Sequence, residues 1–119
     1  MRLCFILFCA VLLSGCLGSA NRPLQLLNGA GPIYPAQARA NGLEGEVVVR
    51  YAVNVDGVVV DPQVVSSNPE GVFDAAAVAA VASWRYAAPI NDGQRVAVPE
   101  VRSVVRFRLD QALDYLENE

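Results

Sequence analysis

The feature that most constrains the fold of this chain is an alternating run of residues in its middle. Apolar and aromatic residues occupy every second position over Val47–Val55, while Glu46, Arg50 and Asn54 occupy positions of the other parity. Successive side chains of a strand point to opposite faces of a sheet. The pattern therefore predicts a strand over Glu44–Val55 that buries one face and leaves the other in water, as is typical of an antiparallel sheet.

The pair Asp56-Gly57 directly after this strand predicts a hairpin. Both central residues of a type I′ turn need positive φ, and Asp-Gly is among the pairs that accept it. We therefore expect a return strand over Val58–Ser66. Pro62 interrupts that strand, and a proline cannot donate a hydrogen bond to a neighbouring strand. The return strand should lie at a sheet edge with a bulge near Asp61-Pro62.

The remaining elements are two helices and a third strand. Pro35–Asn41 is expected to be a short helix that Gly42 ends, because proline suits the first helical turn and glycine the position after the last. Val72–Arg85 is rich in alanine and carries an apolar face, which predicts a longer helix. Val96–Leu109 alternates again and predicts the last strand.

These elements predict an α+β fold with a three-stranded antiparallel sheet in the order 2-1-3 and two helices packed on one face. Consecutive strands tend to be neighbours, and the proline places the second strand outside. Glu44–Val55 is then central, and Val96–Leu109 forms the other edge. Phe73 and Trp84 share the apolar face of the second helix and are expected in the core.

Residues 1–15 have the pattern of an export signal. Arg2 precedes the eleven apolar residues Leu3–Leu13. This run suits the apolar region of a signal peptide and is too short to cross a hydrocarbon core of roughly 30 Å. The segment Leu13–Cys16 resembles the bacterial lipoprotein signal, in which cleavage before the cysteine is coupled to lipidation of its thiol. An ordinary secretory signal and an uncleaved anchor are the alternatives.

Cleavage before Cys16 and lipidation of its thiol would account for all three cysteines of the chain. Cys4 and Cys9 would leave with the signal peptide, so the mature chain keeps one cysteine and its domain folds without a disulfide. Several acyl chains on Cys16 would hold the protein at a membrane. Leu17 is not the aspartate that retains bacterial lipoproteins at the inner membrane. We therefore expect the periplasmic face of the outer membrane rather than the inner membrane.

Two segments flank the expected domain. Residues 16–30 are predicted to be the lipidated N-terminus and a linker, in which an apolar patch of Leu24, Leu26 and Leu27 could dock as a helical turn or as a short strand. Residues 110–119 form an acidic tail, for which a helix is one option. Its acids are Asp110, Asp114, Glu117 and Glu119.

Composition removes several classes of function. The 119 residues include no histidine and no lysine, which excludes catalysis by serine–histidine or cysteine–histidine pairs and zinc binding by histidine. The net charge of −3, from nine basic and twelve acidic residues, does not fit a chain that binds nucleic acid over its surface. We therefore expect no enzyme, cofactor, metal or nucleic-acid partner.

The region from Tyr34 to Leu109 carries a series of short motifs that are informative together. They are Tyr34-Pro35, Ala38, Gly42, Glu44-Gly45, Val47–Tyr51, Asp56-Gly57, Val59, Val64, Ser66, Phe73–Trp84, Arg85-Tyr86, Pro89 and Val104–Leu109. In their order and spacing, rather than in any one motif, they make the region resemble the C-terminal domain of TonB-type energy transducers.

The resemblance implies a domain over residues 31–109 that binds an extended segment in transmembrane transport. Members of the family bind the TonB box, a short segment exposed by outer-membrane transporters, as a strand added beside their last strand. In this chain no proline lies between Glu100 and Leu109. The residues that we expect near a partner are Tyr34, Pro35, Val101, Arg102, Val104, Arg106 and Arg108.

Several arginines have two interpretations. Arg50, Arg102, Arg106 and Arg108 should share the solvated face of the sheet if the strands pair as expected. They can be ordinary solvated residues that guard an exposed edge, or they can contact an acidic partner.

The chain departs from the energy transducers at its N-terminus. Those proteins carry an uncleaved transmembrane helix and a long proline-rich spacer, where this sequence has a lipoprotein-like signal and a short linker. Energy transduction by this chain alone is therefore in question. Alternatives are a structural or assembly lipoprotein whose edge strand pairs with a second copy, giving a homodimer, or with an envelope complex, and a transducer that retains its signal segment as an anchor.

Overall fold

The computed structural model describes residues 21–110, so the predictions for the signal peptide, for Cys16 and for residues 111–119 lie outside the described part. None of the helices in residues 21–110 is long and apolar enough to cross a membrane. The elements in chain order are β1 (Gln25–Asn28), α1 (Ala36–Ala40), β2 (Gly45–Val53), β3 (Val59–Asn68), α2 (Asp74–Ser83), β4 (Arg85–Ala87), β5 (Ile90–Asn91), β6 (Gln94–Arg95) and β7 (Val98–Phe107).

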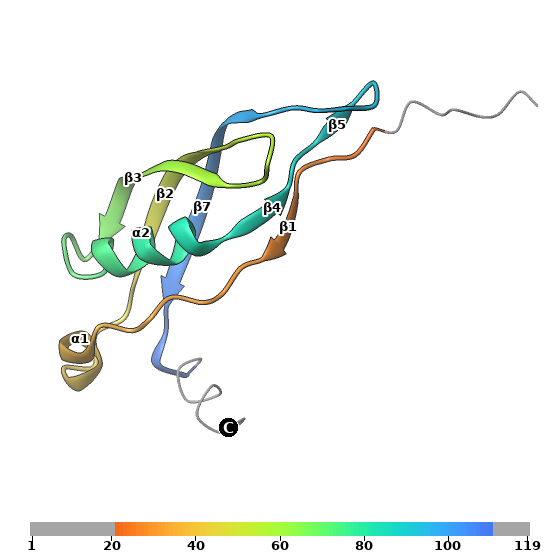
Figure 1. The fold of residues 1–119 in the computed structure, drawn as a ribbon. Coiled ribbons are helices and arrows are strands. Elements are labelled where there is room, and N and C mark those ends of the chain that lie inside the picture. Colours follow the sequence, from red (N-terminus) through yellow and green to blue (C-terminus); the bar gives the residue numbers. More distant parts are fainter. Residues whose placement is uncertain (1–20, 111–119) are drawn as a thin grey trace, which may run out of the picture.

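The main sheet has three antiparallel strands in the order β3-β2-β7 (Figure 1). The predicted α+β class and strand order are confirmed. The alternation that predicted β2 is also found, because Val47, Val49, Tyr51 and Val53 are buried. Central β2 pairs along both sides, so its backbone is satisfied and its inward residues can form the base of the core.

The second strand lies at the edge, with the expected bulge. Arg50 is opposite Gln63 and Ala52 is opposite Val60, so Asp61 and Pro62 together oppose one β2 residue and β3 carries one extra residue. Asp61 takes up the irregularity with a φ of 52°. A second irregularity lies further along β3, so this edge is interrupted twice. Bulges of this kind twist an edge and make pairing with another strand unfavourable.

The hairpin between β2 and β3 exists, but the expected type I′ turn is wrong. Only Gly57 has a positive φ, of 79°. Asn54 organises a longer loop, because its side-chain oxygen accepts the N–H groups of Asp56 and Val58, each at 3.0 Å. The Gly57 N–H donates to the Asn54 carbonyl at 2.9 Å. A three-residue loop ending in a left-handed glycine is the next most common hairpin connection.

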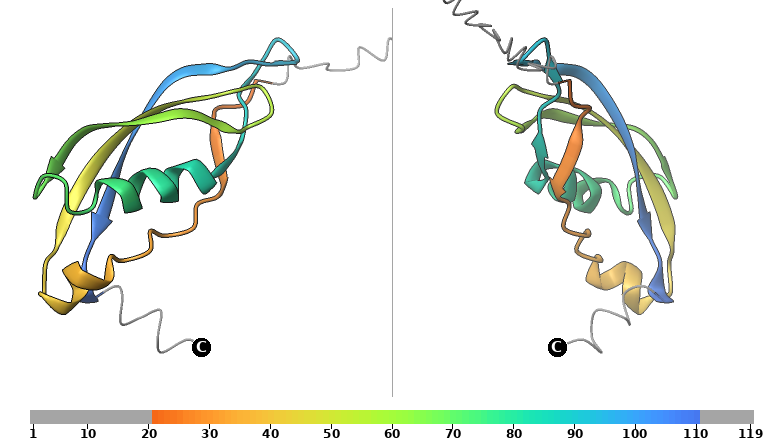
Figure 2. Two further views of the ribbon diagram at one scale, coloured as in Figure 1. Left: turned by 60° about the vertical axis from the view of Figure 1, so that its left-hand side comes forward. Right: turned by 90° about the vertical axis from the view of Figure 1, so that its right-hand side faces the viewer.

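The helices, β1 and β4 all lie on one side of the main sheet (Figure 2). Helix α2 crosses the inner face and buries Ala77, Ala80 and Val81. Short α1 lies at the end of the sheet where β7 finishes, and Gly42 ends it with a φ of 66°. The Gly42 and Leu43 N–H groups bond back to carbonyls of the last turn, which is the Schellman arrangement.

The core is centred on aromatic rings at the end of the sheet near α1. Phe73 is fully buried and stacks on Phe107, with ring centroids 4.4 Å apart. The expected burial of Phe73 is therefore confirmed, although Phe73 occupies the N-cap position of α2 rather than its apolar face. Trp84 is half-buried: its ring packs against the core, while its indole N–H donates to the carbonyl of Ala30 at 2.9 Å. Trp84 thus links the core to the N-terminal segment.

The apolar patch of the N-terminal segment is a strand. Leu26 pairs with Tyr86 in a small antiparallel sheet of β1 and β4. Periodicity over four residues could not distinguish a strand from a helical turn. The docked strand means that residues 25–28 belong to the folded domain rather than to a free linker.

Candidate functional site

One edge of the main sheet, formed by β7, has no neighbouring strand among the residues that the structure describes. Within residues 21–110, β7 pairs only with β2, and its other side carries no strand. The single proline of β7, Pro99, lies near its start beside a register irregularity, so the stretch after Glu100 can pair without interruption. The two edges of the sheet therefore differ: β3 is bulged, whereas β7 is regular for most of its length.

A hydrogen bond in the β2–β3 hairpin sets the backbone directions in β2. The N–H of Asn54 donates to the carbonyl of Val58 at 3.0 Å, so the backbone at position 54 faces β3. Backbone groups alternate in direction along a strand. Even-numbered residues of β2 therefore face β3, and odd-numbered residues such as Val49 face β7.

The same alternation identifies the β7 groups that are available to a partner. Val49 is the register partner of Ser103, so the odd-numbered residues of β7 face β2. The backbone N–H and C=O groups of Arg102, Val104 and Arg106 then point to the open side. These three residues offer the hydrogen bonds that an added strand would use, and all three are among the predicted partner-binding residues.

The inward side chains of β7 hold this edge firmly. Val105 and Phe107 are buried in the core, and Val101 packs against it. Ser103 joins a group of hydroxyls, since its Oγ lies 2.7 Å from the Tyr51 hydroxyl. An edge backed by buried residues is preorganised, which lowers the entropic cost of binding an extended segment.

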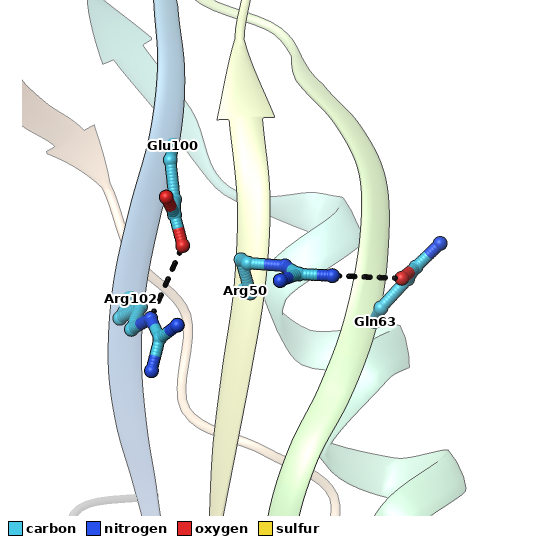
Figure 3. Close-up of polar contacts among 4 residues, drawn as sticks. All are labelled: Arg50, Gln63, Glu100 and Arg102. Atoms are coloured by element: carbon cyan, nitrogen blue, oxygen red, sulfur yellow. Dashed lines mark hydrogen bonds and ion pairs between the residues drawn. The ribbon is translucent and has the colours of Figure 1, made fainter.

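The outer face of the sheet is solvated and carries arginines, as expected (Figure 3). Arg50 on β2 lies opposite Arg102 on β7, so two like charges are neighbours. Each is directed to another partner: Arg50 donates to Gln63 at 3.3 Å, and Arg102 pairs with Glu100 at 3.2 Å. Exposed pairs of this kind stabilise a fold by about 1 kcal/mol or less, which leaves the arginines free to change partners.

The remaining predicted residues lie at the far end of β7. Tyr34 packs edge-on against Phe107 with ring centroids 5.8 Å apart, and its hydroxyl donates to the carbonyl of Leu43. Burial, with a smaller contribution from nearby Glu44, raises the pKa of Tyr34. Pro35 occupies the N-cap position directly before α1. These contacts bring Tyr34 and Pro35 to the end of the open edge, and their role in binding stays a prediction.

Arg108 follows β7 directly and is exposed. It lines a hollow of about 270 Å³ together with Glu44, Glu46 and Phe107. Arg106 lies two residues earlier on the same face of the sheet, and its Nε is 3.9 Å from Oε2 of Glu46. The structure therefore brings the predicted residues of β7 and Arg108 together along one edge, and Glu44 and Glu46 lie beside the arginines at its end near α1.

Sequence reasoning missed a buried group of hydroxyls behind the edge. Tyr86 of β4 hydrogen-bonds to Tyr51 of β2, which also contacts Ser103 of β7, so three strands are joined. Tyr86 is 8% exposed. Alternation correctly placed Tyr51 inward, but no local signal in the sequence indicates which hydroxyl meets it.

This group predicts a loss of stability at alkaline pH. Burial, and then the hydrogen bond with Tyr51, raise the pKa of Tyr86 above its ordinary value. The contribution of protonated Tyr86 to stability is therefore complete below the unfolded-state pKa near 10. It is lost as the pH rises above this value, because the unfolded chain then deprotonates more readily than the folded one. We expect the free energy of unfolding, from urea titrations between about pH 9 and pH 11, to fall by up to about 1.4 kcal/mol per pH unit. In Tyr86→Phe this slope should decrease; an unchanged slope would contradict the assignment.

Within residues 21–110 no group of three or more metal-ligating side chains comes together. The open edge instead presents main-chain donors and acceptors with arginines beside them. The fold and the edge together define a class of protein: a small α+β domain that can accept an extended segment as a further strand.

Comparison with known proteins identifies the family. Residues 30–109 match the family model described as Gram-negative bacterial TonB protein C-terminal, so the chain belongs to the TonB C-terminal family. This family is non-enzymatic, in agreement with the expectation from composition. The TonB protein of Pseudomonas aeruginosa is 36% identical over 92 residues, which cover 71% of this chain and 27% of that protein. The TonB protein of Escherichia coli is 40% identical over 55 residues, covering 46% of this chain and 23% of that protein.

Solved structures agree with the family assignment. The solution NMR structure of the Pseudomonas aeruginosa TonB CTD superposes with a TM-score of 0.64 at 30% identity, covering 76% of this chain and 91% of that chain. The TonB2 protein of Vibrio anguillarum gives a TM-score of 0.56 at 31% identity, covering 75% and 84%. The chain spans about a quarter of the length of the two full-length relatives, so the likeness concerns their C-terminal domain.

Proposed function

We propose that this chain is a TonB-like periplasmic module that binds an extended segment by strand addition to β7. The segment is the TonB box of an outer-membrane transporter or a similar periplasmic sequence, and the process is transmembrane transport. The observation that carries the proposal is the contrast between the two sheet edges. The bulges and Pro62 protect β3, whereas β7 exposes the backbone of Arg102, Val104 and Arg106.

An unprotected edge is a liability unless it is used. Native proteins protect edges with proline, bulges or charge, because an open edge pairs with other chains. Here Val104 is 44% exposed at the centre of the edge, and arginines flank it on both sides. Main-chain hydrogen bonds would supply the affinity, and the arginines would favour a partner with acidic residues at alternate positions.

The proposal includes a lipid anchor at Cys16 and a place at the periplasmic face of the outer membrane. It is supported by the lipoprotein-like segment at residues 13–16 and by Leu17 after the cysteine. Several acyl chains suffice for stable membrane attachment. In this arrangement the chain is an adaptor that presents the binding edge from the membrane surface, rather than a transducer driven from the inner membrane.

The same open edge supports a second candidate, a structural or assembly lipoprotein of the cell envelope. Two copies could pair β7 with β7 across a twofold axis, giving a homodimer. Sedimentation of the folded domain at high concentration distinguishes the two candidates, because self-pairing predicts a concentration-dependent dimer and peptide binding does not.

The proposed function is tested by NMR titration with a peptide of TonB-box sequence. We expect amide shifts confined to Val101–Phe107, at peptide concentrations of up to about 1 mM, since weak strand-addition complexes lie in this affinity range. Hydrogen exchange should slow at the outward amides of Arg102, Val104 and Arg106 and stay unchanged at Ser103, which already faces β2. The β3 amides serve as the internal control. Shifts on β3 instead of β7, or none at all, would contradict the proposal.

A further inference from the structure

The N-terminal segment of the domain is bound along β4 and β5 as far as Asn21. Arg22 and Ile90 exchange two backbone hydrogen bonds, each 2.9 Å long. The Arg22 guanidinium donates to the carbonyl of Ala88 at 3.0 Å, and the side-chain oxygen of Asn21 accepts the Asp92 N–H at 3.1 Å. These contacts extend the β1–β4 pairing to the very start of the described chain.

This docking shortens any N-terminal tether. If residues 16–30 were a free linker, the domain could move some 50 Å from Cys16, at roughly 3.5 Å per extended residue. With Asn21 held on β5, only five residue steps separate Cys16 from the folded domain, a reach of roughly 18 Å. The position where the chain enters the fold then decides which part of the domain can lie close to the anchor.

That entry point lies beside the hairpin of β5 and β6, at the end of the molecule opposite α1 (Figures 1 and 2). We propose that this hairpin end, formed by Asn21-Arg22 and Ile90–Arg95, is the face of the domain that lies against the lipid surface. The inference rests on the proposed lipidation of Cys16. Exposed Arg22 and Arg95 outnumber Asp92 at this end, so its charge suits an anionic lipid surface.

The orientation sets the direction of the binding edge. Strand β7 begins at Val98, three residues after β6 ends, and finishes at Phe107 beside α1. The edge therefore runs away from the lipid surface, and Tyr34 and Arg108 lie at its far end. An antiparallel partner segment would run back toward the same membrane, which suits a segment that continues into a protein of that membrane.

The test is fluorescence quenching on the mature, lipidated chain bound to vesicles of phosphatidylethanolamine and phosphatidylglycerol that contain headgroup spin-labelled lipid. A fluorophore is attached to Gln94→Cys in the hairpin or to Gln37→Cys in α1, both exposed in the structure. Each introduced cysteine is the only free thiol, because Cys16 carries the lipid. We expect several-fold stronger quenching at position 94 than at position 37.

Two matched leucine variants test whether the docked segment produces this orientation. Leu24 is partly buried against the core, so Leu24→Asp should release the segment and lengthen the tether. Leu27 is 63% exposed, so Leu27→Asp adds the same charge and leaves the segment bound. The difference in quenching between positions 94 and 37 should shrink in Leu24→Asp and persist in Leu27→Asp, while circular dichroism checks that both domains fold.

The outcomes separate this inference from the proposed function. The Cys16→Ala variant should not sediment with vesicles, whereas the chain without substitutions should. If the chain without substitutions also fails to sediment with vesicles, both the lipid anchor and the orientation are wrong. If it sediments but positions 94 and 37 are quenched equally, or the Leu24 and Leu27 variants behave alike, the orientation is wrong and the anchor stands.

Discussion

Val104→Pro should abolish or strongly weaken partner binding while the domain stays folded. Position 104 is at the centre of the open edge, where the backbone N–H points away from β2. Proline lacks this N–H, so an added strand would lose a central hydrogen bond and meet the pyrrolidine ring. Proline is tolerated on an edge strand when its nitrogen faces solvent. A lost hydrogen bond with an unsatisfied partner costs about 1–3 kcal/mol, so affinity should fall by about 5- to 150-fold.

Two control variants make this expectation specific. Val104→Ala keeps the N–H and should retain most of the affinity, which separates the backbone from the side chain. Val105→Pro removes an N–H that faces β2 and a buried side chain, so it should destabilise the domain by about 3 kcal/mol or more. Peptide titrations and urea unfolding of the three variants provide the measurement. Binding by Val104→Pro at the affinity of the unchanged domain would show that the partner uses another surface.

The two edges of the sheet illustrate how far sequence reasoning reaches. A proline in the second predicted strand and its absence from the centre of the third were enough to distinguish a blocked edge from an open one. Strand order followed, because consecutive strands tend to be neighbours and the proline places the second strand at an edge. The observed bulge at Asp61-Pro62 agrees with this argument, and the register of β2 with β7 brings residues 101–108 to one edge.

Features that depend on contacts between distant residues were not predictable. The type I′ expectation failed because Asn54, two residues before Asp56, accepts two backbone N–H groups and favours a longer loop. Two consecutive positive φ values occur instead at Asp92 and Gly93, between β5 and β6. A dipeptide indicates a turn, whereas the side chains that flank it decide its type.

The conformation of the N-terminal segment was also not predictable, because it depends on residues that are even farther away in the chain. Its three leucines have no clear period, and its composition is that of a linker. Its conformation depends on β4, some sixty residues away, which offers a strand to pair with, and on the indole of Trp84 just before β4. Such pairing is a tertiary effect that local propensity does not encode.

Gly57→Ala should cause the largest loss of stability of any glycine substitution proposed for this domain. A Cβ at position 57 would overlap the carbonyl oxygen of Tyr86 and lie 2.8 Å from its carbonyl carbon, and both atoms belong to backbone that cannot swing aside. The approach is close because the Tyr86 N–H donates to the Gly57 carbonyl at 2.9 Å, which joins the β2–β3 hairpin to β4. The positive φ of 79° adds a conformational cost. We expect a loss of about 3–5 kcal/mol, a large fraction of the stability of a small domain.

Gly71→Ala isolates the steric part of this effect. Gly71 has nearly the same φ, 76°, but no atom lies within 4 Å of its would-be Cβ. Its substitution should therefore cost only the conformational term, about 1 kcal/mol. Urea unfolding of both variants measures the difference, and equal losses would show that the backbone at Gly57 relaxes away from Tyr86.

Because Tyr86 also holds Tyr51 and, through it, Ser103, a displaced β4 should disturb β7 as well. Gly57→Ala is therefore expected to weaken peptide binding indirectly, through Tyr86, Tyr51 and Ser103, although position 57 does not lie on the open edge.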